Sequence, residues 1–298
     1  MLTKESTESG CMAYYLWEKT QVPTREQERN LLRNYRRGIL LAFQIKKLGF
    51  EPADILELGP GSGYFSSGIR YVFPDARITV VDIVDEVISG NLNIHRFEGI
   101  KGSPDNLTSL VNRKFDLIIA RDILEHVSDI GIVIRNISEL LKENGLFHFL
   151  TPNGHEDVWK HYVNWRISEE PSELLINHVN YFEGKGLLEF LGQHNLYPLK
   201  YYTYQVKTTF KGQGWSLNRL QAATPSVNRS ASMIINEFKN DNDQPVFNKK
   251  DILDQWYLRT RLKWLTFLYC HYMHQPLLKI NPVWNIGHEI FGLFIRKS

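Results

Sequence analysis

Cysteine is scarce in this sequence, and neither sign of charge dominates it. The 298 residues include two cysteines, Cys11 and Cys270, which have no metal-ligand spacing. So few cysteines favour free thiols in a reducing cytoplasm. Lys and Arg total 35 and Asp and Glu total 33, which gives a formal net charge of +2. Because the chain as a whole has no strong field, we expect no nucleic-acid partner.

Long apolar runs are also missing. No stretch of about eighteen apolar residues occurs, so we expect no membrane span, while peripheral contact with a membrane stays open. The first residues, MLTKESTESGCMAYYLWEK, have no apolar core of the signal-peptide type. We therefore expect a cytoplasmic location.

Short apolar runs alternate with helical segments from residue 55 onward. The runs predict strands at 54–58, 77–83, 93–97, 114–120, 146–150 and 197–206. The segments between them predict helices at 64–73, 106–112, 132–145 and 184–195. Runs of consecutive apolar residues suit strands buried on both faces. Alternation of strand and helix predicts an α/β fold with a parallel sheet and right-handed crossovers.

A long helix is predicted before this region, ending near Leu48 with Gly49 just past its end. Helical spacing assigns its apolar face to Leu32, Tyr35, Ile39 and Phe43. A second face carries arginines at every fourth position, namely Arg25, Arg29, Arg33 and Arg37. These arginines are either exposed to solvent or line the edge of a pocket for an anion.

The chain is thus divided into four segments. Residues 1–50 form an N-terminal helical extension, and 51–206 form the α/β domain. Residues 207–286 form a helical insertion of low β-character. It would act as a lid, contact the substrate or contact a second copy of the chain. Residues 287–298 supply a last strand. A homodimer stays open, because a long aromatic helix in the insertion could pack on a second copy.

The stretch ILELGPGSG, followed by Asp82, indicates a nucleoside site. Gly59, Gly61 and Gly63 stand where the first strand passes into a helix, and glycine permits a sharp turn and close approach of a ligand. Parallel sheets bind ligands at this carboxyl edge. Asp82 ends the next strand, nineteen residues after Gly63, and a carboxylate there can accept both hydrogen bonds of a ribose diol.

A dinucleotide is disfavoured at this site. The G-x-G-x-x-G pattern places its third glycine where this sequence has Tyr64. Glu57, two positions before Gly59, is a poor neighbour for a pyrophosphate and a reasonable one for an ammonium group. An NAD-dependent oxidoreductase therefore ranks among the less favoured alternatives.

Five segments in order resemble the class I S-adenosylmethionine-dependent methyltransferases. They are ILELGPGSG (motif I), VVDI (the acidic motif), FDLIIARDILEHVSD, LLKENGLFHFLTPN and HVNYFEGKGLLEFLGQHN. The resemblance covers residues 55–204, half of the chain. It implies a Rossmann-like, doubly wound, seven-stranded, mostly parallel sheet, flanked by the N-terminal helical extension and the helical C-terminal insertion.

The resemblance also implies a cofactor, S-adenosyl-L-methionine, with S-adenosyl-L-homocysteine as product. Residues at the methionine end would be Glu57, Gly59, Gly61 and Gly63. Asp82 would hold the ribose, Ile83 would lie on the adenine, and Asp122 and Ile123 would face the cofactor or the substrate. The loop EGIKGSPDN departs from the family's acidic pattern, and Gly102 or Ser103 would contact the adenine amino group.

Three histidines are candidates for a general base. Methyl transfer is an in-line displacement, and an oxygen nucleophile must also lose a proton, to which histidine is well matched near neutral pH. The candidates are His155 and His178, and then His126, whose other reading is that it orients the loop beside the cofactor. We expect no metal, because no cluster of carboxylates or histidines has ligand spacing.

The sequence therefore predicts transfer of a methyl group to an oxygen of a small-molecule or sugar/glycan-type acceptor. The acceptor could be anionic, and carbohydrate or natural-product biosynthesis is the expected setting. The first alternative is an N-methyltransferase acting on an amine-bearing metabolite or amino sugar. A non-catalytic partner that keeps the fold is less favoured. RNA methylation is disfavoured, because ARDI stands after the fourth strand in place of an N-P-P-Y/F tetrapeptide.

Overall fold

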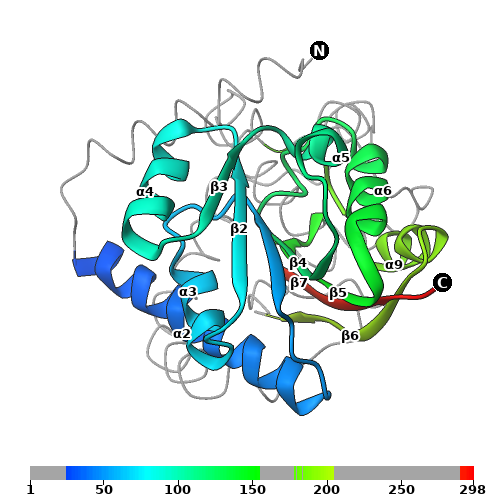
Figure 1. Ribbon diagram of the computed structural model, residues 1–298. Helices are drawn as coiled ribbons and strands as arrows, with labels where there is room; N and C mark the ends of the chain where they lie inside the picture. Colours follow the sequence, from blue (N-terminus) through cyan, green and yellow to red (C-terminus); the bar gives the residue numbers. More distant parts are fainter. Residues whose placement is uncertain (1–24, 155–177, 179, 183, 205–288) are drawn as a thin grey trace, which may run out of the picture. The chain divides into compact units, whose positions relative to one another are not determined.

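The computed structural model describes residues 25–154, 178, 180–182, 184–204 and 289–298 (Figure 1). The predictions for His155 and for the insertion at 207–286 lie outside these residues. Seven strands form one sheet in the order β3-β2-β1-β4-β5-β7-β6. They are β1 (Asp54–Leu58), β2 (Arg77–Asp82), β3 (Glu98–Lys101), β4 (Phe115–Arg121), β5 (Leu141–Pro152), β6 (Leu196–Tyr204) and β7 (Glu289–Arg296).

Helices connect the strands, in the alternation that the sequence predicts. They are α2 (Arg25–Lys47), α3 (Tyr64–Val72), α4 (Asp85–His95), the 3-10 turn η1 (Pro104–Asn106), α5 (Leu107–Leu110), α6 (Ile130–Leu140) and α9 (Gly184–Gln193). β1 pairs in parallel with β2 and with β4, and β2 pairs in parallel with β3. The predicted Rossmann-like, seven-stranded, mostly parallel sheet is confirmed.

The chain divides into two compact units. The described residues of the first unit are 25–149, 194–199 and 293–298, and those of the second are 150–154, 178, 180–182, 184–193, 200–204 and 289–292. In the second unit, Gly154 N–H donates to Phe182 O (2.9 Å), and the Tyr201 hydroxyl donates to Gly184 O (2.6 Å). The four-segment division drawn from the sequence stays a prediction.

Strand order determines where a ligand can bind in the first unit. From β1 the chain winds outward through β2 and β3, and β4 then returns to the other side of β1. This reversal makes a crevice outside the carboxyl ends of β1 and β4, the usual ligand position in such sheets. The strands beneath it are almost wholly buried, as their apolar runs predict, notably Ile55, Leu56, Leu58, Val80, Val81 and 117–120.

Ion pairs and hydrogen bonds join the opposite, amino-terminal ends of these strands. The Asp116 carboxylate accepts the backbone N–H of Asp54 (2.8 Å), and Lys142 donates to both Asp116 (2.9 Å) and Asp54 (3.1 Å). Burial raises the pKa of Asp54, but hydrogen bonds and charges from Arg77 and Lys142 outweigh burial and hold that pKa below its usual value. This network ties β1, β4 and β5 together at the edge away from the crevice.

Two element boundaries predicted from the sequence are wrong. Residues 93–95 end helix α4, and the strand comes later, at Glu98–Lys101. Asp85 and Glu86 in the first turn suit the helix dipole, and Arg96 closes the helix in the left-handed region (φ 55°). The helix predicted to reach Gly145 ends at Leu140, because Leu141 is already extended and begins β5.

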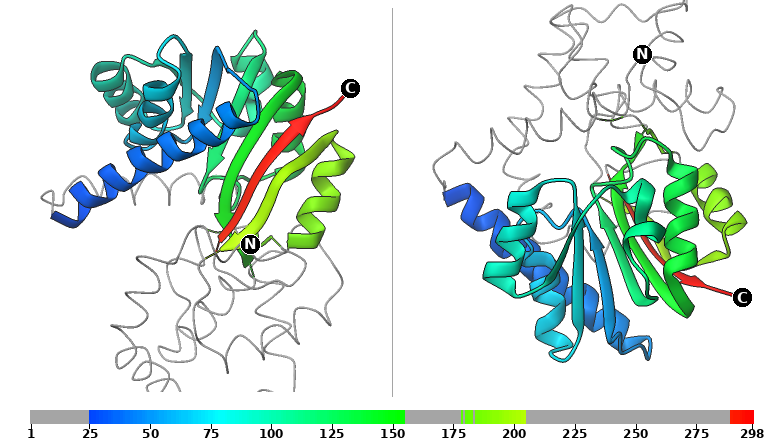
Figure 2. Two further views of the ribbon diagram at one scale, coloured as in Figure 1. Left: turned by 90° about the horizontal axis from the view of Figure 1, so that it is seen from below. Right: turned by 45° about the horizontal axis from the view of Figure 1, so that its top comes forward.

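The apolar face predicted for the first helix is also partly wrong. Leu32 and Phe43 are 47% and 54% exposed, whereas the buried residues of α2 include Leu41, Ala42 and Ile45. The reason is the neighbouring helix α3, which lies against α2 (Figure 2). Gly38 belongs to the covered face, so the packing of the two backbones, rather than the largest side chains, decides which face is buried.

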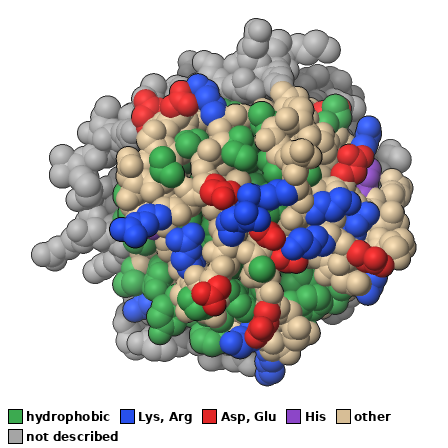
Figure 3. All heavy atoms as spheres, in the orientation of Figure 1, with side chains coloured by type: hydrophobic (Ala, Val, Ile, Leu, Met, Phe, Trp, Pro, Cys, Tyr) green, Lys and Arg blue, Asp and Glu red, His purple; other side chains and the backbone are tan. Residues whose placement is uncertain are grey.

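Acidic and basic side chains are interspersed on the face shown in Figure 3, with hydrophobic ones between them, in keeping with the formal net charge of +2. Among the helices in the described part of the chain, none is both long and apolar enough to cross a membrane.

The contact of α2 with α3 gives a stability test. A Cβ on Gly38 would overlap the carbonyl oxygen of Phe65, so Gly38→Ala forces the helices apart, and we expect a loss of about 1–3 kcal/mol. Gly90 in α4 is the matched control, because no described heavy atom would lie within 4 Å of its Cβ. Gly90→Ala should gain about 0.5–1 kcal/mol from helix propensity.

Urea unfolding of the two variants and the parent measures both effects. Equal changes in the two variants would contradict a close backbone crossing at Gly38.

Candidate functional site

A glycine turn joins β1 to α3 at the crevice. Gly59, Gly61 and Gly63 all have positive φ, at 60°, 50° and 74°. Gly59 N–H donates to Val81 O of β2 (2.9 Å), and Gly63 N–H donates to Pro60 O (2.9 Å). The left-handed backbone is costly for residues with a side chain, so the turn requires glycine.

The three glycines differ in what lies beside them. A Cβ on Gly59 would overlap the side chain of Ile123, and a Cβ on Gly63 would overlap that of Asn91. At Gly61, by contrast, no heavy atom of the described residues would lie within 4 Å. The turn is therefore packed at both ends and open in the middle, where a ligand can approach the backbone.

Glu57 is a buried acid beside this turn. It is 3% exposed, and its Oε2 makes no hydrogen bond within the described part of the chain. Burial raises the pKa of Glu57 to about 7, although the Ser66 hydroxyl and the Arg121 guanidinium lower it in part. Arg121 itself lies over the Phe65 ring, 4.0 Å from the ring centre. The orphaned oxygen leaves Glu57 able to accept a hydrogen bond from a bound group.

Asp82 ends β2, half-buried at the same edge. Its Oδ1 accepts the backbone N–H of Val84 (2.9 Å). Burial raises the pKa of Asp82 to about 6, against the backbone hydrogen bonds from Val84 and Ile83. The Asp82 carbonyl accepts Gly102 N–H (2.9 Å), so the loop after β3 is attached directly to the end of β2.

This loop contains an acid to which the sequence analysis assigned no role, Asp105. Ser103 Oγ and Ser128 Oγ donate to Asp105 Oδ2 (2.9 and 3.0 Å), and Asn136 Nδ2 donates to its backbone carbonyl (3.0 Å). The signal was present in the sequence as the aspartate of GSPDN. Only the fold shows that Asp105 anchors the loop that presents Gly102 and Ser103.

The segment after β4 supplies the other predicted residues. Asp122 is exposed and has φ 53°, an uncommon and strained conformation for a residue with a side chain. Ile123 lies against Gly59. His126 is half-buried, and its backbone N–H donates to Ile123 O (2.9 Å). Glu125 is buried.

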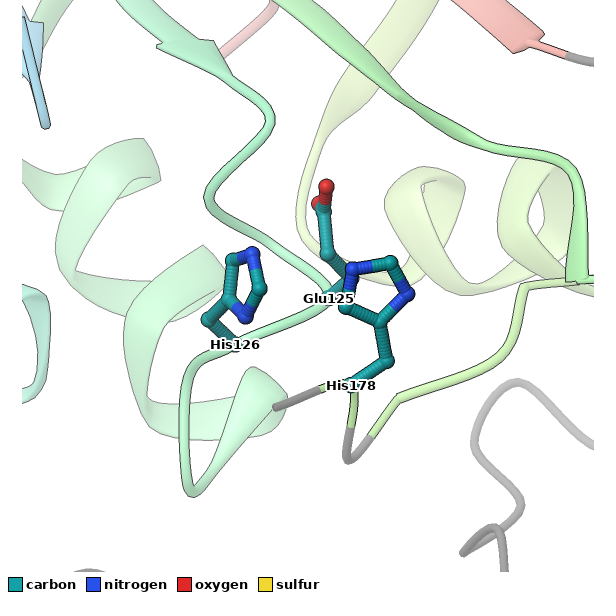
Figure 4. Close-up of side chains that lie close together, drawn as sticks. All are labelled: Glu125, His126 and His178. Carbon is teal, nitrogen blue, oxygen red and sulfur yellow. The ribbon is translucent and has the colours of Figure 1, made fainter. Parts of the chain in front are cut away.

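Figure 4 draws Glu125 and His126 on this segment, together with His178, which belongs to the second unit. The ring centre of His178 lies 6.5 Å from that of Tyr181 in its own unit. His155 lies outside the described residues. The general base therefore stays a prediction, as does the expected absence of a metal.

Two further residues beside the turn were missed, Asn91 and His95 of α4. The predicted strand at 93–97 included His95 and left Asn91 outside any helix, whereas α4 places these two residues, four positions apart, on one face. Asn91 Nδ2 donates to Gly61 O (2.9 Å), and His95 Nε2 lies 2.8 Å from Ser62 O.

The first unit thus brings most of the predicted cofactor residues to one edge. An open glycine turn at the start of a helix offers backbone N–H groups to an anion, while Glu57 and Asp82 offer carboxylates to donors or cations. This donor and acceptor set fits S-adenosylmethionine, which carries a carboxylate, an ammonium, a sulfonium and a ribose diol.

The chain is similar in sequence to known proteins. Residues 25–201, more than half of the chain, match the family described as a methyltransferase domain. Malonyl-[acyl-carrier protein] O-methyltransferase of Acetivibrio thermocellus is 29% identical over 99 residues, 33% of this chain and 35% of that protein. Ubiquinone biosynthesis O-methyltransferase of Pelagibacter ubique is 27% identical over 133 residues, 41% and 52% of the two chains. The chain thus spans about a third to a half of these relatives.

A solved structure shares this fold. It is the plantazolicin methyltransferase BamL, in complex with a triazolic desmethylPZN analogue and S-adenosylhomocysteine. The TM-score is 0.52 at 16% identity, covering 99% of this chain and 98% of that one. Taken with the family match over residues 25–201, the strand order and the glycine turn, this places the chain in the methyltransferase-domain family as a class I S-adenosylmethionine-dependent methyltransferase.

Proposed function

We propose that this methyltransferase transfers its methyl group to an oxygen of a small-molecule acceptor. The open glycine turn with Glu57 and Asp82 beside it carries the cofactor half of the proposal. The acceptor half is supported by the names of two relatives. One is an O-methyltransferase for malonyl-[acyl-carrier protein], and the other is an O-methyltransferase of ubiquinone biosynthesis. A sugar or glycan-type acceptor and a cytoplasmic location belong to the same proposal.

The positions described above support a role for each predicted cofactor residue. Glu57 and the glycine turn would hold the methionine end, where the acid attracts the ammonium and the backbone N–H groups attract the carboxylate. Asp82 would accept the ribose hydroxyls, with Ile83 near the adenine. The loops at Gly102–Ser103 and Asp122–Ile123 would complete the cofactor's surroundings.

The chemistry needs alignment and one proton acceptor. When bound, the cofactor supplies a methyl group that passes in line to the acceptor oxygen, with the C–S electron pair returning to sulfur as the C–O bond forms. The protein holds the two partners in that line. A histidine, His126, His155 or His178, would take the hydroxyl proton.

The first prediction concerns the acceptor. Purified protein incubated with methyl-labelled S-adenosylmethionine and a panel of hydroxyl, carboxyl and amine compounds should form labelled methyl ethers or esters. The rate should be unchanged by EDTA, because no metal takes part in the proposed step. Label on amines alone would replace the proposal by N-methylation.

A second prediction tests Asp82. Asp82→Ala removes the acceptor of the ribose diol, and calorimetric titration with S-adenosylhomocysteine should show about 10- to 100-fold weaker binding. Asp85→Ala is the matched control, because Asp85 is an exposed acid three residues later whose partner is Lys101 at the surface. Parent-like binding by Asp82→Ala would refute the ribose assignment.

A third prediction concerns Glu57 and pH. Its pKa is raised from the usual 4.5 to about 7, so the folded protein binds this proton more tightly than the unfolded chain does. The contribution of Glu57 to stability is therefore full below pH 4.5 and is lost as the pH rises through 7. Glu57→Gln removes the dependence, and the ligand-free variant should be about 3 kcal/mol more stable than the parent at pH 8.

Urea unfolding at pH 4.5 and pH 8 measures the Glu57 effect, and the two proteins should differ little at the lower pH. The same variant should bind S-adenosylmethionine more weakly at pH 8, because it lacks the carboxylate that attracts the cationic ligand. Equal stability of variant and parent at pH 8 would show that an ionised Glu57 does not destabilise the ligand-free fold.

A further inference from the structure

Helix α4 supports the glycine turn through two side chains. Asn91 is 2% exposed, and its amide donates to the carbonyls of Gly61 and Val87, both at 2.9 Å. One turn further along α4, His95 Nε2 lies 2.8 Å from the carbonyl oxygen of Ser62, and His95 Nδ1 lies 2.7 Å from Ser67 Oγ. Two consecutive carbonyls of the turn are therefore bound from the same helix.

The two hydrogen bonds of His95 determine which ring nitrogen carries the hydrogen. A carbonyl oxygen can only accept, so the Nε2 of His95 must carry a hydrogen to bond with Ser62 O. In the neutral ring Nδ1 then accepts from the Ser67 hydroxyl, which satisfies both nitrogens.

Neighbouring groups hold the His95 ring in place. The ring lies edge-on to Tyr64 (centroids 5.1 Å apart) and stacks on Phe97 (5.2 Å). Arg70 donates to the His95 backbone carbonyl (2.7 Å) and lies over the Phe97 ring.

Gly63 is explained by the same pair. A Cβ at this position would overlap Asn91 Oδ1 and would lie 2.6 Å from His95 Cδ2. The last glycine of the motif therefore makes room for the two supporting side chains, whereas Gly61 faces open space.

The direction of the Gly61 carbonyl fixes the direction of one N–H group. The Ser62 carbonyl, near His95 Nε2, belongs to the next peptide, whose Gly63 N–H donates to Pro60 O (2.9 Å), so the peptides on both sides of Ser62 are held. The peptide bond is planar and trans, so the N–H of a peptide points opposite to its C=O. Asn91 holds the Gly61 carbonyl toward α4, and the Ser62 N–H of that peptide must point away from α4. Ser62 is exposed, at the open middle of the turn.

We propose that Asn91 and His95 are positioning residues for the cofactor, which lock the turn so that Ser62 N–H is presented to the carboxylate of the methionine end. The inference rests on the proposed placement of that end at the glycine turn. A carboxylate is the ligand expected there, because backbone N–H groups at a helix start favour anions.

Two ligands separate positioning from general structural support. S-adenosylhomocysteine has the amino-acid end, and 5′-methylthioadenosine keeps the adenosine part without it. His95→Leu should bind S-adenosylhomocysteine about tenfold more weakly, the value of one hydrogen bond to a charged group, with unchanged affinity for methylthioadenosine. Asn91→Leu, which is similar in shape, should show the same pattern.

Rescue and control variants make the test specific. His95→Gln should stay near the parent, because its amide nitrogen can donate as the ring Nε2 does. Ser67→Ala removes the hydrogen-bond partner of His95 Nδ1 and should give a smaller loss of affinity for S-adenosylhomocysteine. This variant provides the test if His95→Leu does not fold. Ser138→Ala loses another bond to a backbone carbonyl, that of His194 (2.8 Å), and should change neither ligand's affinity.

Calorimetric titration of each folded variant with both ligands gives the answer. Loss of affinity for both ligands alike, or for neither, would overturn the positioning role. If the parent itself binds the two ligands with equal affinity, the amino-acid end is not held at the turn, and the proposed placement fails rather than the role of α4. The methyl acceptor plays no part in the measurement, so the outcome is independent of the O-methylation proposal.

Discussion

The backbone conformation of one turn is the constraint on which the site depends. Between Leu58 and Tyr64 the chain must leave a buried strand, reverse, and start a helix, and it does so with three glycines at positive φ. Two of them are also closed in by neighbours: Ile123 lies against Gly59, and α4 lies against Gly63. The remaining one, Gly61, faces open space. Helix α4 and the segment after β4 therefore both pack against this turn, and its backbone is left open at Gly61.

Charge is distributed differently at the two ends of the sheet. At the amino-terminal ends, Asp54 and Asp116 are paired with Lys142, and hydrogen-bonded carboxylates there connect the strands. At the carboxyl ends, Glu57 is buried and Asp82 is half-buried, and burial raises the pKa of both. Such acids reduce the stability of the ligand-free fold and are retained where they bind something. The contrast is a physical reason for placing the binding site at the carboxyl edge, in addition to the general rule for parallel sheets.

The family match and the shared fold establish the reaction type, and the acceptor is a separate question. The curated relatives align over about a third to a half of their length, so their acceptors are not those of this chain by alignment alone. A sheet of this order holds the same cofactor in front of many acceptors, because the acceptor is recognised by loops and added segments rather than by the strands. The proposal of an oxygen acceptor therefore rests on the chemistry of methyl transfer and on the relatives' names. The identification of the cofactor rests on the family match and the fold.

The sequence by itself determined the α/β class, the bounds of β1, the glycine turn and the two acids near it. These features are local: apolar runs define buried strands, and positive φ demands glycine whatever surrounds it. Tertiary structure decided the rest. His95 was predicted in a strand, and its role depends on contacts with Ser62 and Ser67, about thirty residues away along the chain. Asp105 and the buried face of α2 were missed for the same reason. A side chain's partner and its exposure are set by which elements pack against it, and no periodicity within one segment records that.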